Sequence, residues 1–201
     1  MSVSRSSAVA LWAALAFCVL VSPNAHAIGI REVQLSPLEE AILNRAVHCP
    51  NAVNPDREAL AQLLVLERKH GVPDKLRGMS LAAACVESHY DPKAKGDYRL
   101  RDGKMKPMAI GLFQQWPWWV PSYHIDRQDP IQATDAWLTH IANQVKGVQR
   151  KCGHVGEERT WVIAWVVGVR APRKDGRCHQ EPTHWSVLKD WRRSWSSELS
   201  V

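Results

Sequence analysis

One glutamate in the sequence has neighbours that suit acid catalysis. Glu87 follows the apolar run Ala83 to Val86 and precedes Ser88 and the turn Tyr90-Asp91-Pro92. Because a residue before proline is pushed out of the helical region, we expect a helix that ends here, with Glu87 in its last turn. Partial burial there would favour the protonated carboxyl group that a general acid needs. Taken alone, however, a glutamate at a helix end is most often a solvated surface charge.

A second segment, Gly111-Leu112-Phe113-Gln114, gives Glu87 a context. Together with Glu87-Ser88, Tyr90-Asp91-Pro92 and Ala94, it resembles the motif of the lytic transglycosylases of the soluble and goose-lysozyme-like type. The resemblance covers about residues 76–168 and implies a lysozyme-like helical fold with Glu87 as the catalytic residue. The substrate-binding residues expected around it are Ser88, Tyr90, Gln114, Trp116 and Trp165.

The reaction of that family needs only one carboxyl group. The glutamate first protonates the bond between N-acetylmuramic acid and N-acetylglucosamine, then takes the proton of the muramyl C6 hydroxyl, so that a 1,6-anhydro sugar is released. The resemblance therefore implies peptidoglycan glycan strands as substrate, with no cofactor and no metal. A secretion or conjugation apparatus would be a fitting partner for a small wall-opening enzyme, but no residue identifies one.

The spacing between the two segments leaves a second enzyme open. The interval from Glu87 to Gly111 exceeds the family's usual gap by about one hairpin, which introduces Asp97 and Asp102. Either aspartate could supply the second carboxylate of a hydrolytic lysozyme. Aspartate is also favoured in turns for its local hydrogen bonding, so both residues have an ordinary structural interpretation as well.

The segment around Trp165 leaves a third interpretation open. Ala164-Trp165-Val166-Val167-Gly168 stands where the family has Ala-Tyr-Asn-Ala-Gly. An indole N–H donates a hydrogen bond but cannot accept one, and valine does neither. These differences motivate a catalytically inert wall-binding or secretion-assembly protein of the same fold.

Short helices punctuated by proline and glycine are expected to position these residues. Ser36-Pro37-Leu38-Glu39 forms a capping-box start for a helix that should reach about His48. Asn54-Pro55-Asp56 opens a second helix that Gly71 ends. The helix that carries Glu87 should run from Ser80 to Ser88.

After Glu87 the pattern changes. Asp102-Gly103 predicts a hairpin turn between two short strands, and prolines should keep the aromatic segment Trp116 to Pro121 irregular. Further helices are expected from Asp129-Pro130 to Lys146-Gly147, from Thr160 and from Thr183. Helical spacing predicts core positions for Trp137, Trp161, Trp191 and Trp195, whereas sugar stacking stays open for Trp116, Trp118 and Trp119. The predicted fold class is mainly α, with a small β-hairpin.

Residues 1–27 have the features of a cleaved signal peptide. Arg5 precedes the apolar run Ala8 to Val21, and Ala25-His26-Ala27 offers a cleavage site. The run is shorter than the about 20 residues that a spanning helix needs. Residues 28–201 would then form one domain, a monomer in the periplasm or outside the cell. Lipoprotein attachment through Cys18 is disfavoured because a bulky Phe17 precedes it.

Charge and cysteines agree with an exported protein. The 201 residues carry a formal charge of +6, and loss of Arg5 leaves 25 basic against 20 acidic residues, a net +5. This suits an anionic polymer such as peptidoglycan; no nucleic-acid motif is present, and no nucleic acid is expected. An even number of cysteines predicts two disulfides, whose three possible pairings stay open, and the spacings match no common zinc pattern. These candidates are Cys49, Cys85, Cys152 and Cys178.

Overall fold

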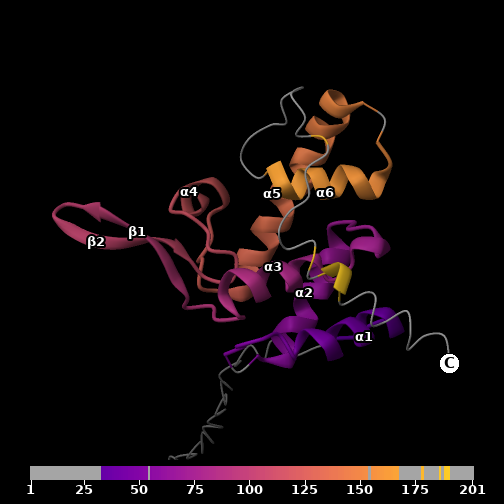
Figure 1. Cartoon of the computed structure of the whole chain (residues 1–201), viewed down its shortest axis with the longest axis horizontal. Helices are drawn as coiled ribbons and strands as arrows, with labels where there is room; N and C mark the ends of the chain where they lie inside the picture. Colours follow the sequence, from indigo (N-terminus) through magenta and orange to yellow (C-terminus); the bar gives the residue numbers. More distant parts are fainter. Residues whose placement is uncertain are drawn as a thin grey trace, which may run out of the picture. The chain divides into compact units, whose positions relative to one another are not determined.

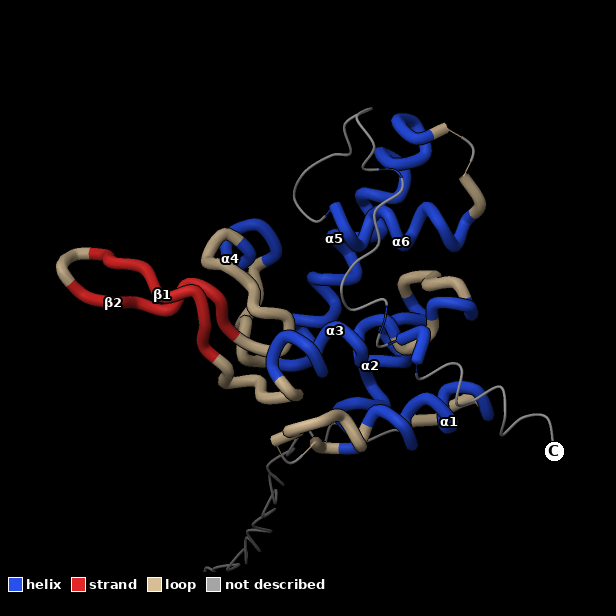
Figure 2. Tube along the Cα trace, viewed as in Figure 1, coloured by secondary structure: helices blue, strands red, loops and turns tan. Residues whose placement is uncertain are grey.

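The chain folds mainly into α-helices with one small antiparallel hairpin, as the sequence predicts (Figures 1 and 2). The computed structural model describes residues 33–53, 55–153, 155–167, 178, 186 and 188–190. All of them belong to the compact unit Glu32–Val201. The predicted leader, Cys18, most of the helix predicted from Thr183, and Trp191 and Trp195 lie outside these residues.

The first two helices begin where their caps predict. Ser36 accepts a hydrogen bond from the Glu39 backbone, while the Glu39 carboxylate accepts one from Ser36 N at 2.8 Å, which completes the capping box. Asp56 accepts hydrogen bonds from two backbone N–H groups at the start of the second helix. The resulting helices are α1 (Pro37–Ala46) and α2 (Arg57–Lys69), followed by the short 3-10 turn η1 (Asp74–Leu76).

The third helix, α3 (Met79–Ser88), is the most buried of the chain's described helices and lies against α1 and α2 (Figure 1). Every residue from position 79 to 85 is buried, which explains why the side chains on all sides of this stretch are small or apolar. Its core neighbours include Leu63 of α2 and Leu138 of the fifth helix. A rigid, buried helix therefore leads into the turn that follows Glu87.

Three details of the later helices differ from the predictions. α5 (Pro130–Cys152) continues past Gly147, because burial of Val148 outweighs the helix penalty of glycine, which is about 1 kcal/mol. The aromatic segment contains a short helix, α4 (Trp119–Tyr123), in which Pro121 occupies the first turn, where no intrahelical partner for an N–H exists. α6 (Glu157–Val167) begins before Thr160, which donates to the Gly156 carbonyl instead of capping the helix.

The predicted hairpin is present. β1 (Lys95–Arg101) pairs with β2 (Lys104–Ile110), with Arg101 opposite Lys104. Asp102 and Gly103 between them have φ angles of 51° and 71°, the two positive values that a type I′ turn requires. The strands make their main contacts with each other, and the hairpin projects away from the helices (Figures 1 and 2).

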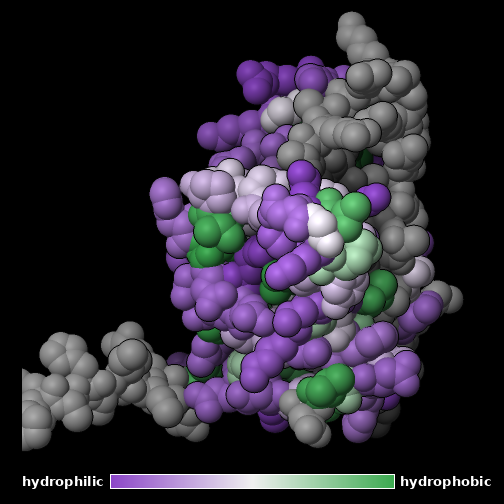
Figure 3. All heavy atoms as spheres, turned by 90° about the vertical axis from the view of Figure 1, so that its left-hand side faces the viewer, coloured by the Kyte–Doolittle hydropathy of each residue, from purple (hydrophilic) through white to green (hydrophobic). Residues whose placement is uncertain are grey.

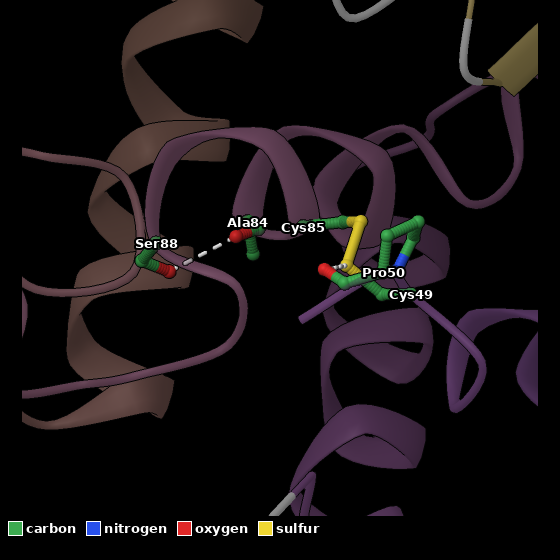
Figure 4. The surroundings of a disulfide bond; sticks show 5 residues. All are labelled: Cys49, Pro50, Ala84, Cys85 and Ser88. Atoms are coloured by element: carbon green, nitrogen blue, oxygen red, sulfur yellow. Dashed lines mark hydrogen bonds between the residues drawn. A yellow bond between two sulfur atoms is a disulfide. The ribbon is translucent and has the colours of Figure 1, made fainter. Parts of the chain in front are cut away.

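Both predicted disulfides form, and the structure supplies their pairing. Cys49 is bonded to Cys85, and Cys152 is bonded to Cys178 (the first is shown in Figure 4). Such bonds are typical of proteins that leave the reducing cytosol. None of the helices in the described part of the chain is both long and apolar enough to span a membrane.

Loss of the Cys49–Cys85 bond should lower the stability of the protein markedly. The bond closes a sequence separation of 36 residues, and release of that constraint from the unfolded chain lowers the free energy of unfolding by about 4 kcal/mol. Urea unfolding of the double variant Cys49→Ala/Cys85→Ala measures this loss. An unfolding free energy equal to that of the parent protein would show that the bond does not form.

Candidate active site

Glu87 lies in the last turn of α3, as predicted, but the expectation that it is partly buried is wrong. The residue is exposed, and its neighbour Val86 is 41% exposed. The continuous buried stretch of α3 ends at Cys85, where the disulfide to Cys49 fixes the helix, and the next two residues, Val86 and Glu87, are exposed. Glu87 is thus an exposed residue at the end of a helix that is otherwise mostly buried.

The turn after Glu87 has an unusual backbone. His89 and Tyr90 are consecutive non-glycine residues with positive φ angles, 53° and 64°. The Ser88 hydroxyl donates to the Ala84 carbonyl at 2.9 Å and is buried, so it closes the helix end (Figure 4). The His89 carbonyl accepts a hydrogen bond from Val53 N at 3.0 Å, which holds the turn against the segment before α2.

Tyr90 points into the protein. It is 4% exposed, and burial raises the pKa of its phenol far above the usual range. Its hydroxyl has no hydrogen-bond partner among the described residues. A cavity of about 200 Å³ is lined by Tyr90 together with Leu63 of α2 and Leu112 of the second motif segment. Tyr90 therefore anchors the turn by packing its side chain into the hydrophobic core.

The two motif segments meet in space. Gly111 N donates to the Ala94 carbonyl at 3.0 Å, and Ala94 N donates to the Asp91 carbonyl at 3.1 Å. Gln114, at a φ of 45°, donates from Nε2 to the Gly111 carbonyl at 3.0 Å. Residues that stand far apart in the sequence thus form one continuous hydrogen-bonded structure that begins at the end of α3.

Two residues that the sequence interpretation missed hold this junction. The Arg127 guanidinium donates to the Met108 and Gln115 carbonyls at 2.8 and 2.7 Å, and burial lowers its pKa. Gln115 is 2% exposed and donates to the Ala133 carbonyl at 3.0 Å. No local pattern marks Arg127, since its partners are carbonyl groups of other segments.

Both aspartates of the hairpin have local partners. The Asp97 carboxylate accepts a hydrogen bond from Trp116 Nε1 at 3.1 Å, which joins the base of the hairpin to the segment after Gln114. Asp102 lies at the hairpin tip and pairs with Lys106 Nζ at 2.8 Å. Trp116 itself is only partly buried.

Trp165 is a buried residue. It is 7% exposed and meets Trp137 edge to face, with ring centroids 6.0 Å apart. Trp137 in turn stacks on Phe113 of the second motif segment at 4.7 Å. Trp165 thus supports the motif through a row of aromatic rings that runs from α6 to Phe113.

The remaining aromatic residues of the loop also pack together. Trp118 and Trp119 stack at 4.5 Å, and Trp119 contacts the ring of His140. The Tyr123 hydroxyl lies 2.7 Å from His140 Nδ1. Trp118 is partly buried and Trp119 is 8% exposed, so Trp118 has more surface left for a ligand.

Glu67 is the third residue that was missed. Its carboxylate is fully buried and accepts hydrogen bonds from Gly78 N at 2.7 Å, Ser80 N at 2.7 Å and Ser80 Oγ at 2.5 Å, so it caps the start of α3. The sequence contained a signal: Glu67 continues the apolar stripe of Leu60, Leu63 and Leu64 on the buried face of α2.

Glu67 should make the stability of the protein depend on pH. Burial raises its pKa from 4.5 to about 7, against the opposing hydrogen bonds from Ser80 and Gly78 and the charge of Arg77. The folded chain therefore holds this proton more tightly than the unfolded chain. The stabilisation is complete below about pH 4.5 and is lost as pH rises through about 7, a fall of up to about 3 kcal/mol.

Urea unfolding across this pH range, for the parent protein and for Glu67→Gln, measures the effect. The variant lacks the titrating group, so its unfolding free energy should change less between pH 4.5 and 7. Equal pH dependence of the two proteins would assign the titration to another group.

Comparison with known proteins does not add to these observations: no family model, curated protein or solved structure matches the chain.

Proposed function

We propose that this protein is a peptidoglycan lytic transglycosylase with Glu87 as its single acid and base. The observation that carries the proposal is the hydrogen bond from Gly111 N to the Ala94 carbonyl. It joins the turn after Glu87 to the second segment of the resemblance. Two segments that together resemble one motif are thus brought together, and the exposed Glu87 stands at the helix end that leads into their junction.

In the proposed reaction the Glu87 carboxyl group donates its proton to the oxygen between N-acetylmuramic acid and N-acetylglucosamine as the muramyl C1–O bond breaks. The carboxylate then takes the proton of the muramyl C6 hydroxyl while that oxygen bonds to C1. Glu87 regains its proton, and no water is consumed.

The distribution of backbone strain supports a functional site here. Seven non-glycine residues of the described chain have positive φ angles, and five of them lie between positions 89 and 114. Such conformations cost of order 1 kcal/mol each and are concentrated at functional sites. Asp102 owes its positive φ angle to the type I′ turn and His89 to the C-cap of α3, so the strain that supports a functional site lies at Tyr90, Asp97 and Gln114.

The local partners of the aspartates favour a transglycosylase over a hydrolytic lysozyme. The Asp97 carboxylate accepts a hydrogen bond from Trp116, and the Asp102 carboxylate forms a salt bridge with Lys106, so each has a structural role. A retaining or inverting hydrolase would need one of them about 5–9 Å from Glu87, across the substrate. We place the enzyme in the periplasm or outside the cell, in agreement with its two disulfides.

Digestion of purified sacculi, followed by mass analysis of the fragment ends, tests the proposal. A transglycosylase releases 1,6-anhydromuramyl ends, whereas a lysozyme using Asp97 or Asp102 releases reducing ends. Binding to sacculi without fragment release would indicate an inert wall-binding or secretion-assembly protein. Only the first result agrees with the proposal.

A further inference from the structure

The outer part of the hairpin, residues 98–107, has two chemically different faces. Residues directly opposite each other in an antiparallel pair share a face, and successive residues alternate between faces. The pairs Tyr98–Pro107 and Leu100–Met105 therefore form one face, which we call the apolar face. The pairs Arg99–Lys106 and Arg101–Lys104 form the other, the basic face.

The apolar face is exposed to solvent. Tyr98, Leu100 and Met105 are 51%, 69% and 61% exposed, and they are three of the six large hydrophobic residues that are exposed in the described chain. The hairpin projects from the helices, and its side of the molecule shows hydrophobic patches within a hydrophilic surface (Figures 1 and 3). Exposed apolar side chains gathered on one face are a feature of surfaces that bind a protein or a membrane.

The charge of the hairpin indicates what it binds. Residues 95–110 contain five basic and two acidic residues. The two acidic residues are engaged locally, Asp97 by Trp116 and Asp102 by Lys106. The hairpin therefore carries a net positive charge on one face and exposed apolar side chains on the other, which together complement a surface that is both anionic and apolar.

We propose that the hairpin docks on an anionic lipid surface. The apolar face would lie at the boundary of headgroups and acyl chains, where Tyr, Leu and Met side chains are favoured. Both edges of a two-stranded sheet have unpaired backbone groups, so the hairpin stays at headgroup depth and does not enter the hydrocarbon. The long basic side chains remain within about 10 Å of the lipid charges, a distance over which salt does not fully screen them.

A glycan strand accounts for the hairpin less well than a lipid surface does. The carboxylates of a cell-wall polymer would complement the basic face but would leave Leu100 and Met105 exposed to water. At a lipid surface the apolar face makes the contact, and the long basic side chains of the opposite face still reach the anionic headgroups. A lipid surface also gives a reason for an apolar face on a hairpin that is not needed to build the helical core.

Docking would fix the position of the candidate active site. Gln114 lies against Gly96 at the base of the hairpin, and Trp116 is bonded to Asp97 in the same strand. The hairpin is therefore attached to the segment that completes the site. A docked hairpin would hold this segment near the membrane surface, so that glycan close to the membrane is reached first.

Sedimentation with vesicles tests the proposal directly. The parent protein should bind vesicles of phosphatidylglycerol and phosphatidylcholine in equal parts, and should bind phosphatidylcholine vesicles much less. Leu100→Ser/Met105→Ser should weaken binding about tenfold or more, and Arg99→Gln/Arg101→Gln by about tenfold on the anionic vesicles alone. These exposed sites contribute little to stability, so the variants should fold normally, as circular dichroism would check.

Val53→Ser is the matched control, because Val53 is 55% exposed but lies outside the hairpin; its binding should equal that of the parent. Glu87→Gln should also bind normally, which separates this proposal from the proposed enzyme activity. Absence of vesicle binding, or equal binding by Leu100→Ser/Met105→Ser, would overturn the proposal. If the parent does not bind vesicles but binds sacculi or a protein, and Leu100→Ser/Met105→Ser loses that binding, the proposal is overturned in favour of a wall or protein partner.

Discussion

Gly111→Ala should lower the free energy of unfolding by at least about 3 kcal/mol, since it combines overpacking with a left-handed backbone. A Cβ atom at this position would lie 1.9 Å from the Arg127 carbonyl oxygen, a backbone atom that cannot rotate away. The φ angle of 81° adds a conformational penalty for any side chain. Relief of the clash requires the backbone at Gly111 to move away from Arg127. That movement would also displace Gln114, which is hydrogen-bonded to the Gly111 carbonyl.

Gly103→Ala is the matched control for this effect. Gly103 has a similar φ angle of 71°, but a Cβ atom there would meet nothing within 4 Å. Only the conformational penalty of about 1 kcal/mol is expected. Urea unfolding of the two variants separates the cost of the steric clash from the conformational penalty. An equal loss of unfolding free energy in both variants would contradict the close approach of Gly111 to Arg127.

Glu87→Gln should abolish glycan cleavage while leaving the fold intact. Glutamine has nearly the same shape but cannot donate and regain a proton, and general acid–base catalysis contributes roughly 100- to 10,000-fold for each transfer. Because Glu87 is exposed, the change in stability should stay within about 0.5 kcal/mol. Asp97→Asn and Asp102→Asn are the matched controls, and both should retain activity.

Local sequence signals predicted the elements well where the deciding contacts are local. The capping box of Ser36 and Glu39, the Asp56 cap and the Asp102-Gly103 turn all use partners within a few residues. The hairpin and the starts of α1 and α2 are therefore confirmed. Gly147 failed as a helix end because Val148 is buried against residues far away in the sequence.

The candidate site could be predicted only in part. The motif residues marked the turn after Glu87 and the Gly111 segment, which the structure joins through Ala94. The prediction that Glu87 is partly buried was wrong, because the apolar run before it is buried only as far as Cys85. Arg127 could not be predicted because its partners are backbone carbonyl groups that only the tertiary fold brings near, whereas Glu67 left a signal as a member of the buried face of α2.

The disulfide pairing lay beyond the sequence for the same reason. Four cysteines allow three pairings, and the choice depends on which chain segments meet. The contact of α1 with α3 places Cys49 beside Cys85. The separation of apolar and basic residues onto two faces of the hairpin, by contrast, follows from the alternation of residues along each strand. The exposure of these faces depends on the tertiary fold, in which no helix of the described residues covers them.

The central claim, that Glu87 alone carries the acid and base steps of a lytic transglycosylase, is tested most directly by one measurement. Purified sacculi are digested in parallel with the parent protein and with Glu87→Gln, and the released fragments are analysed by mass for 1,6-anhydromuramyl ends. The parent should release such ends and the variant none. Anhydro ends released by Glu87→Gln, or reducing ends released by the parent, would contradict the claim.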